Sequence, residues 1–366
     1  MRSIAIPKFY SIWQQRLLQQ IPDSCDSRLT NMIWLMMGIF QSRSVQLNLV
    51  VRKLPIRAKK LSLVMRMRRF LDNPGVQVRA WYRPLAKQLI EAAGSAGSVR
   101  LIIDASKVSF GFQLVMVAIA YRGRALPLAW TWVGYHQGHS TTHKQLALLS
   151  YVRSLLPEGL SVSLVGDCEF GRSRLLEYLD HWGWTYALRQ PGDHLVMTKQ
   201  VSRWRRLDSL LAVTNVPLWL GPVLLTQANA YPTHLVLFWR HGEKTPWFLA
   251  TNLRCPRAAL QLYRRRMWIE QMFGDMKGHG FDLESSHLQH FLRLSRLTLA
   301  VCFLYVWLMA TGEYVDFSDL NDYVDRSDRR DLSLFRLGWD FIERCFALHD
   351  PCPSTFFPNF CSVYGG

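Results

Sequence analysis

The order of apolar segments between residues 99 and 189 leaves few folds open to this chain. Three strand-like apolar runs come first and predict a meander, because Arg122-Gly123 is a turn signal between the second and the third. Helical and apolar segments then alternate. The predicted elements are strands at 99–104, 112–121 and 126–133, a helix from Ser140 or Thr141 to about Leu156, a strand at 161–166, a helix at 172–182 and a strand at 184–189.

This order is that of the ribonuclease H-like fold, which is of the α/β class. In this topology the first and fourth strands are neighbours in one sheet. The linker Gly94-Ser-Ala-Gly97-Ser separates the strands from an N-terminal helical pattern. We predict an all-α domain at 1–95, a ribonuclease H-like domain at 96–192 plus 256–315, a β-rich insertion at 193–255 and a helical tail at 316–366, which is a candidate for dimerisation.

The insertion and the segments after it have their own patterns. Polar turns separate short β-rich runs in the insertion, and amphipathic or wholly apolar helical patterns follow it. The expected elements are strands at 220–226, 234–240 and 247–251, and helices at 256–277, 288–311 and 332–348.

The net charge of +17 is concentrated at one end of the chain. Residues 1–100 hold 17 Lys and Arg against 4 Asp and Glu, so this segment carries +13 and the rest only +4. Such an excess is the electrostatic footprint of a polyanion binder. Nucleic acid fits better than a membrane, because no basic helix with lipid-facing aromatic residues stands at a terminus. A basic face kept for solubility is the alternative.

One short helix in the basic segment is predicted to contact DNA. Residues 57–70 place cations on one side of an apolar stripe, directly after the apolar turns of residues 45–54. This arrangement resembles a helix-turn-helix with residues 57–70 as the reading helix. The candidate DNA-binding residues are Arg57, Lys59, Lys60, Arg66, Arg68 and Arg69.

Cysteine usage and the apolar runs predict a reducing, aqueous compartment. The seven cysteines are scattered and form no C-x-x-C pair, which argues against a disulfide scaffold or a zinc ribbon. The N-terminus lacks a signal-peptide pattern, and the longest apolar run, 299–310, is shorter than the roughly 20 residues that span a bilayer. We therefore expect a cytoplasmic, nucleoid-associated protein without a membrane partner.

Two aspartates end predicted strands. Asp104 and Asp167 each follow an apolar run, where an unpaired charge is costly to bury. Because the first and fourth strands are neighbours in the predicted sheet, their carboxyl ends bring the two carboxylates together. A hard divalent cation would offset the repulsion between them. The alternative is two separate aspartates that cap turns.

The predicted helix at 256–277 adds a third carboxylate. Counted from Glu270, the residues at i−7, i−4 and i+7 are Tyr263, Arg266 and Lys277. At about 100° per residue, all four fall within an arc of roughly 60°. One helix face thus carries a carboxylate flanked by two cations and a phenol. Such a face can complete a metal site while the cations bind phosphate oxygens.

The spacing Tyr263-x2-Arg266-x3-Glu270-x6-Lys277 resembles the signature of cut-and-paste insertion-sequence transposases of the DDE class, insertion sequence family four. The resemblance covers about residues 28–311. Cys168 follows the second aspartate where many relatives carry Arg, so one phosphate contact of the family is in question. Further similar segments are Ile-Ile-Asp104-Ala-Ser, Val-Gly-Asp167-Cys-Glu-Phe-Gly, Tyr-Ala-Leu-Arg189 and Lys277-Gly-His-Gly-Phe-Asp-Leu-Glu-Ser-Ser.

The resemblance implies a DNA transposase. Asp104, Asp167 and Glu270 would be catalytic and would hold two Mg²⁺ ions, replaceable by Mn²⁺, about 4 Å apart. Such an enzyme binds double-stranded DNA at terminal inverted repeats, cleaves the ends by phosphodiester hydrolysis and joins them to target DNA. A homodimer would hold the two ends together.

The resemblance also assigns DNA contacts. The expected phosphate-binding residues are Tyr263, Arg266, Lys277 and Arg189. In relatives with this signature, excision passes through a hairpin, and an aromatic residue of the insertion holds a flipped base. Trp239 and Trp247 are the candidates here, since an indole stacks well on a base. Both could equally be core tryptophans.

Other interpretations of the same residues stay open. A non-catalytic protein that binds transposon ends, or a structure-selective nuclease, could use the same fold. The spacing of His136, His139 and His143 is compatible with zinc, although no fourth ligand is near in the sequence. Glu169 is either an auxiliary acid or, more simply, a residue of a turn or helix start.

Overall fold

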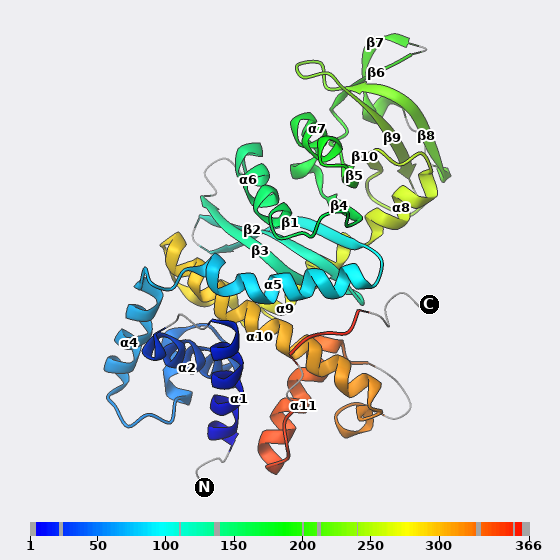
Figure 1. Cartoon of the computed structure of the whole chain (residues 1–366). Helices are drawn as coiled ribbons and strands as arrows, with labels where there is room; N and C mark the ends of the chain where they lie inside the picture. The colour runs from blue at the N-terminus through cyan, green and yellow to red at the C-terminus, as the bar shows by residue number, and fades with distance from the viewer. Residues whose placement is uncertain are drawn as a thin grey trace.

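The computed structural model describes residues 5–21, 25–109, 111–134, 140–199, 201–210, 214–239, 241–326, 331–353 and 356–360. Within these residues a single mixed sheet of ten strands forms the centre of the molecule (Figure 1). Its strands are β1 (Val99–Ser109), β2 (Phe112–Tyr121), β3 (Arg124–Gly134), β4 (Val162–Gly166), β5 (Thr185–Arg189), β6 (Leu195–Thr198), β7 (Val201–Arg206), β8 (Thr214–Leu225), β9 (Tyr231–Trp239) and β10 (Trp247–Thr251).

The strand order is β3-β2-β1-β4-β5-β10-β9-β8-β6-β7. β1 pairs antiparallel with β2 and parallel with β4, which confirms the predicted meander and the predicted neighbours. The helices between the later strands are α6 (Thr142–Arg153) and α7 (Ser173–His181), close to the predicted ranges. Thr141 caps α6 by accepting a hydrogen bond from the backbone N–H of Lys144.

The five strands after β5 continue the same sheet. β10 pairs antiparallel with β5, so backbone hydrogen bonds join the β-rich segment directly to the strands before it. The predicted strand at 247–251 is β10, whereas β8 begins six residues before its predicted start. The β6–β7 hairpin was not predicted, because β6 has only four residues and arginines interrupt the short apolar pattern of β7.

The described residues before β1 are helical or irregular. The helices are α1 (Ala5–Gln20), α2 (Asp26–Ser42), α3 (Leu47–Val50), the 3₁₀ turn η1 (Val51–Lys53), α4 (Lys60–Asp72) and α5 (Val78–Ser95). The predicted reading helix therefore begins three residues later than expected, and Arg57 and Lys59 precede it. α5 packs on β1 and β3 rather than on the first helices alone.

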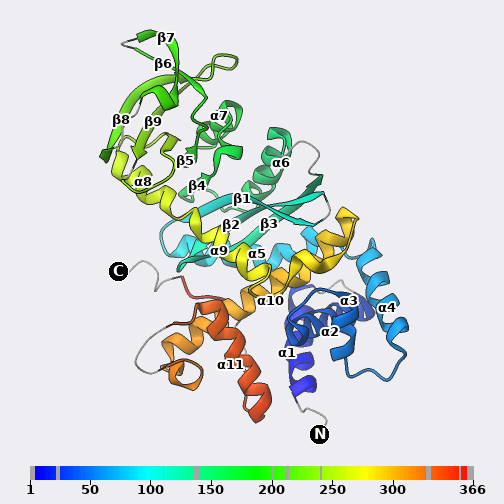
Figure 2. The same ribbon diagram turned by 180° about the vertical axis from the view of Figure 1, so that it is seen from behind.

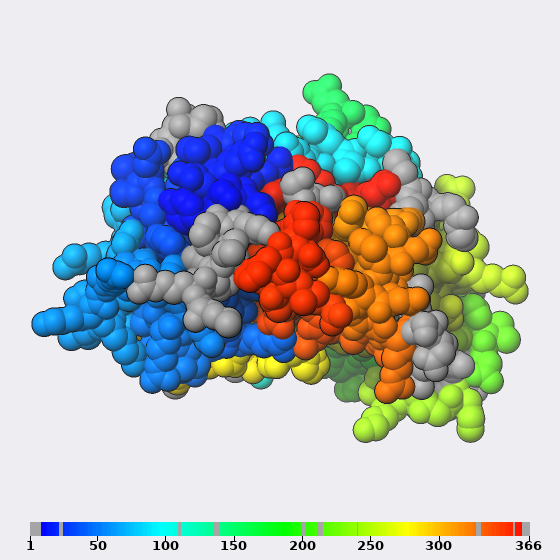
Figure 3. Space-filling view, turned by 90° about the horizontal axis from the view of Figure 1, so that it is seen from below, coloured from blue at the N-terminus to red at the C-terminus, as the bar shows by residue number. Residues whose placement is uncertain are grey.

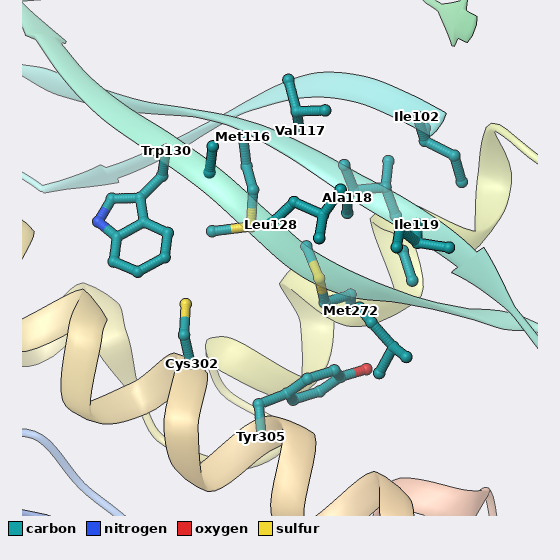
Figure 4. Packing of buried hydrophobic residues seen from close by; sticks show 14 of the residues in the cluster. Ile102, Met116, Val117, Ala118, Ile119, Leu128, Trp130, Met272, Cys302 and Tyr305 are labelled. Carbon is teal, nitrogen blue, oxygen red and sulfur yellow. The ribbon is translucent and has the colours of Figure 1, made fainter. Parts of the chain in front are cut away.

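A long apolar helix, α10 (Phe291–Phe317), forms the main support of the sheet. Figures 1 and 2 show α10, α5 and α9 (Met267–Met276) on one face of the sheet, with α6 on the other. Cys302 and Tyr305 of α10 face Met116, Leu128 and Trp130 of the sheet (Figure 4). By length and composition α10 could cross a membrane, but 94% of its most apolar stretch is buried inside the protein, as in a core helix.

The expected single helix at 256–277 is wrong, because the chain forms two helices. α8 (Pro256–Arg264) packs on β4, β5, β8 and β9, whereas α9 packs on β1, β2 and β3. The N–H groups of Arg266 and Ile269 bond to carbonyls three residues back, so a tight turn separates the two helices. One straight helix could not follow both halves of a twisted sheet.

The C-terminal segment covers the other end of α10. α11 (Leu334–Leu348) lies between the N-terminal helices and the end of α10 (Figure 3). After it, Phe356 packs edge-on against Trp13 of α1 and stacks on Trp307 of α10. The end of the described chain thus fastens α1 to the central core.

Candidate active site

The ends of β1 and β4 bring two aspartates together. Ile103 pairs with Gly166, so the next residues, Asp104 and Asp167, lie side by side at one edge of the sheet. A Cβ on Gly166 would lie 2.9 Å from a methyl group of Ile103, so only glycine fits this position without displacing the strand. The predicted juxtaposition of the two carboxylates follows from this parallel pairing.

Glu270 reaches the same region from the first turn of α9, through Arg266. The guanidinium of Arg266 donates from Nη1 to Asp104 Oδ2 at 3.2 Å and from Nη2 to Glu270 Oε1 at 2.5 Å. Arg266 is buried, whereas the side chain of Glu270 is 41% exposed. The arginine therefore bridges two carboxylates that lie 166 residues apart in the sequence.

The protonation of Asp104 depends mainly on its burial and, to a smaller extent, on the neighbouring charges. Burial raises the pKa of Asp104 to about 7, although the charge of Arg266 opposes this rise. The negative charges of Asp167 and Glu270 make smaller contributions in the same direction as burial, and the value of about 7 includes them. Close, partly buried carboxylates of this kind favour a bound cation.

Arg189 joins the site from the strand after Asp167. Its Nη1 lies 3.8 Å from Asp167 Oδ1, and its Nη2 donates to Thr245 Oγ1 and to the carbonyl of Pro246. This arginine therefore ties the segment before β10 to the aspartate. Asp167 Oδ1 is buried and accepts no hydrogen bond within the described chain.

Tyr263 and the two candidate tryptophans lie on the insertion side of the site. Tyr263 is buried, its hydroxyl has no hydrogen-bond partner among the described residues, and its ring packs edge-on against Trp247 at 5.0 Å. Trp247 is half-buried and adjoins Phe238. Trp239 is also half-buried, and its indole N–H donates to the carbonyl of Glu243. Trp247 is thus the tryptophan in contact with the four-residue motif.

Lys277 directly follows α9 and is paired with an acid. Its Nζ lies 2.9 Å from Glu284 Oε1, a residue of the 3₁₀ turn η4 (Leu283–Ser286). The expectation of one helix face with Tyr263, Arg266, Glu270 and Lys277 in line fails, because the turn at Arg266 puts Tyr263 on a different helix. What the structure brings together instead is Tyr263, Arg266, Glu270 and the two aspartates.

Glu169 has a role that sequence reasoning did not identify. Its carboxylate accepts hydrogen bonds from Gln113 Nε2, the Ser140 N–H and Ser140 Oγ, and Gln145 donates to its backbone carbonyl. It thereby joins the loop after Asp167 to β2 and to the start of α6. Only its position two residues after Asp167 hinted at this role, because all three partners are distant in sequence.

The donor set fits a hard divalent cation, because it consists of carboxylate oxygens that include the buried, unbonded Asp167 Oδ1. As the side chains stand in the described parts of the chain, no three His, Cys, Asp or Glu residues converge on one metal position. The Arg266 guanidinium accounts for this, since it fills the space between Asp104 and Glu270.

The other predicted residues lie away from this site. Lys59, Lys60, Arg57, Arg68 and Arg69 are exposed at or before α4, whereas Arg66 is half-buried and donates to Asn31 Oδ1 at 2.6 Å. Of the three histidines with zinc-like spacing, His136 and His139 lie outside the described residues.

The mixed sheet, the two strand-end aspartates and the glutamate on α9 are the features expected of a DDE domain. Residues 94–307 match the family described as Transposase DDE domain. This match spans more than half of the chain, and the chain belongs to that family.

The chain was also compared with solved structures and with curated proteins. The chain is similar to the protein in a cryo-EM structure of a piggyBac transposase synaptic complex with hairpin DNA, with a TM-score of 0.43 and 10% sequence identity, over 98% of this chain and 84% of that chain. A comparison with curated proteins gives no match.

Proposed function

We propose that this chain is a DNA transposase that binds the terminal inverted repeats of an insertion sequence, cleaves them and joins them to target DNA. The observation that carries the proposal is that Asp104 and Asp167 follow adjacent strand ends and that Arg266 joins Asp104 to Glu270, inside a domain that matches the family. Three carboxylates from three elements suit phosphodiester chemistry better than a purely structural role. We further propose a ribonuclease H-like fold and membership of insertion sequence family four.

Asp104, Asp167 and Glu270 would hold the metal, for which we propose two Mg²⁺ ions. Bound Mg²⁺ supplies an activated water or 3′-hydroxyl and stabilises the leaving oxygen. Arg266 would leave its two carboxylates and bind a DNA phosphate, which offers the same bidentate geometry. Arg189 and Lys277 would bind phosphates on either side. Tyr263 would position the flanking strand.

We propose that excision passes through a hairpin and that Trp247 stacks on the flipped base. Support comes from the edge-on contact of Trp247 with Tyr263, whereas the Trp239 indole donates to the carbonyl of Glu243. Stacking of a base on an indole contributes about 1–3 kcal/mol. Exposed cations on α4 would contact the duplex of the transposon end. We also propose that two copies act as a homodimer and that the protein is cytoplasmic and nucleoid-associated.

The test is a cleavage assay on a plasmid that carries the gene with its native flanking DNA. Wild-type protein with Mg²⁺ should break the DNA at inverted repeats on both flanks, and Glu270→Gln should bind the same DNA without cutting it. Denaturing gels would show hairpin ends directly. Cleavage by Glu270→Gln, or tight binding by the wild type without any cut, would refute the proposed catalysis.

A further inference from the structure

A cavity of about 470 Å³ lies at the start of α5, outside the candidate active site. α4, the beginning of α5 and the beginning of α10 meet on this flank of the molecule in both Figure 1 and Figure 2. The lining includes Arg79, Arg83 and Arg296 but no acidic residue. Three guanidinium groups around one hollow make it strongly attractive to an anion.

Arg296 is the buried member of this cluster, with 6% of its surface exposed. Its Nε and Nη1 donate to the carbonyls of Val76 and Leu71, and Nη2 has no acceptor within the described chain. Burial lowers the pKa of Arg296, and the carboxylate whose charge offsets this effect is Asp72. Both oxygens of Asp72 are already bound by Arg293. Arg296 thus keeps a donor available without a dedicated counter-ion.

The first turn of α5 adds a second attraction for an anion. α5 has 18 residues, and the side chain of its N-cap residue, Gln77, makes no capping hydrogen bond. Gln77 and the first helical residues line the cavity. The free N–H groups and the positive end of the helix dipole therefore point toward the hollow. Helix N-termini of this kind bind phosphate groups.

Arg79 and Arg83 line the cavity and lie one helical turn apart on α5. The guanidinium of Arg79 lies 4.5 Å from the ring centre of Tyr151, so the start of α5 is in contact with α6 at this point. Arg79, Arg83 and Tyr151 all line the cavity, and the charges of both arginines act on the Tyr151 hydroxyl. Both arginines are exposed, so a ligand that enters the cavity from solvent can contact them.

We propose that this cavity is a phosphate-binding site that takes one backbone phosphate of the DNA duplex contacted by α4. The inference rests on the proposed function, because it takes DNA as the source of the phosphate. It adds a contact next to the last turn of α4, where Asp72 and Arg293 already join α4 to α10. The duplex would then be held both by α4 and by the rigid core.

The test compares Arg83→Gln with Lys87→Gln, which removes an equally exposed cation one turn further along α5 and outside the cavity. Arg83→Gln should weaken binding of end-containing duplex about 10-fold at low salt and reduce the slope of log K against log salt by about 0.9. Lys87→Gln should change both much less. Equal losses in the two variants would overturn the proposal, because they would indicate a diffuse basic face.

A second arm uses inorganic phosphate as the probe. At matched ionic strength, phosphate should raise the melting temperature of the wild-type full chain above its value in chloride, and Arg79→Gln/Arg83→Gln should lose this gain. Stabilisation by phosphate with an unchanged DNA salt slope would overturn the assignment to DNA. If the protein shows the Arg83-dependent salt slope and the stabilisation by phosphate but never cleaves DNA, the proposed function is refuted and the phosphate site is not.

Discussion

The Nη1 atom of Arg266 lies 3.2 Å from Asp104 Oδ2, inside a site whose acidic residues are expected to hold metal ions. The same guanidinium bonds to Glu270, so one protein cation stands where the charges of two carboxylates converge. An arginine in this position stabilises the free protein, and its departure would accompany the arrival of metal and DNA.

Replacement of Arg266 should therefore change both stability and metal response. Arg266→Gln leaves Asp104 buried without its cation, and we expect the free energy of unfolding to fall by about 3 kcal/mol. Mn²⁺ should stabilise this variant more than the wild type, because the metal no longer competes with a guanidinium. Urea denaturation with and without MnCl₂ measures both effects. The control is Arg264→Gln, which replaces an exposed arginine two residues away. Equal Mn²⁺ responses in all three proteins would contradict this expectation.

Removal of Glu169 should loosen the loop that carries Asp167. Glu169→Ala deprives Gln113 and Ser140 of their common acceptor, with an expected loss of about 3 kcal/mol in stability. DNA cleavage should slow by at least about 10-fold while DNA affinity stays unchanged, since the Glu169 carboxylate is bound by Gln113 and Ser140 and acts by positioning the aspartate. Glu158→Ala, on an exposed turn, serves as the matched control. A Glu169→Ala variant with wild-type stability and rate would refute this role.

The pair between Arg124 and Asp275 should hold α9 against the sheet. Arg124 Nε lies 2.8 Å from Asp275 Oδ2, and both residues are largely buried. Arg124→Ala should cost about 3–5 kcal/mol, because it leaves a buried carboxylate unpaired. The double variant Arg124→Ala/Asp275→Ala should lose less than the sum of the single variants, as a double-mutant cycle in urea would reveal. Additive losses would mean that the two residues act independently.

The Arg124→Ala loss should also depend on pH. Burial raises the pKa of Asp275, while Arg124, Tyr305 and His279 lower it. Without Arg124 the folded protein binds a proton at Asp275 more readily than the unfolded chain does, so stability increases as pH falls. The variant should therefore lose less stability at pH 5 than at pH 8, and the opposite order would refute this explanation.

The exposed cations of α4 should differ in their effect on DNA binding. Lys60→Ala and Arg68→Ala should each weaken binding and reduce the salt slope by up to about 0.9, the value for one phosphate contact. Arg66→Ala should act less, because Arg66 Nε is already bound to Asn31. Fluorescence anisotropy at several salt concentrations measures the slopes, with Arg326→Ala as a distant control. Unchanged slopes would move the DNA contact to another surface.

The sequence predicted the order of the central strands because each is a mostly apolar run bounded by a turn or a helical segment. It also predicted that Asp104 and Asp167 meet, since strand order and parallel pairing place both carboxylates. It could not predict the turn at Arg266, because Leu260, Ile269 and Phe273 keep a helical period on both sides of the break. Tertiary packing on two differently oriented parts of the sheet decides that turn.

Long-range polar contacts were equally hidden. Nothing in the local sequence pairs Glu169 with Ser140, or Arg124 with Asp275, because each pair is joined only by the final fold. The pairing of Lys277 with Glu284 was likewise invisible, although both residues lie in the segment that resembles the transposase family. The division of the chain into separate domains, the dimer and the cellular location stay predictions.

The hydrogen-bonded continuity from β4 through β5 to β10 has a mechanical consequence. Adjacent strands in a sheet are about 4.8 Å apart, so the strand that ends just before Asp167 and the strand that begins at Trp247 are held two such steps apart. The backbone of Trp247 cannot move away from Asp167 unless the hydrogen bonds between these strands break. In the proposed reaction, the strand spacing would then set the distance between the cleaved bond and the stacked base.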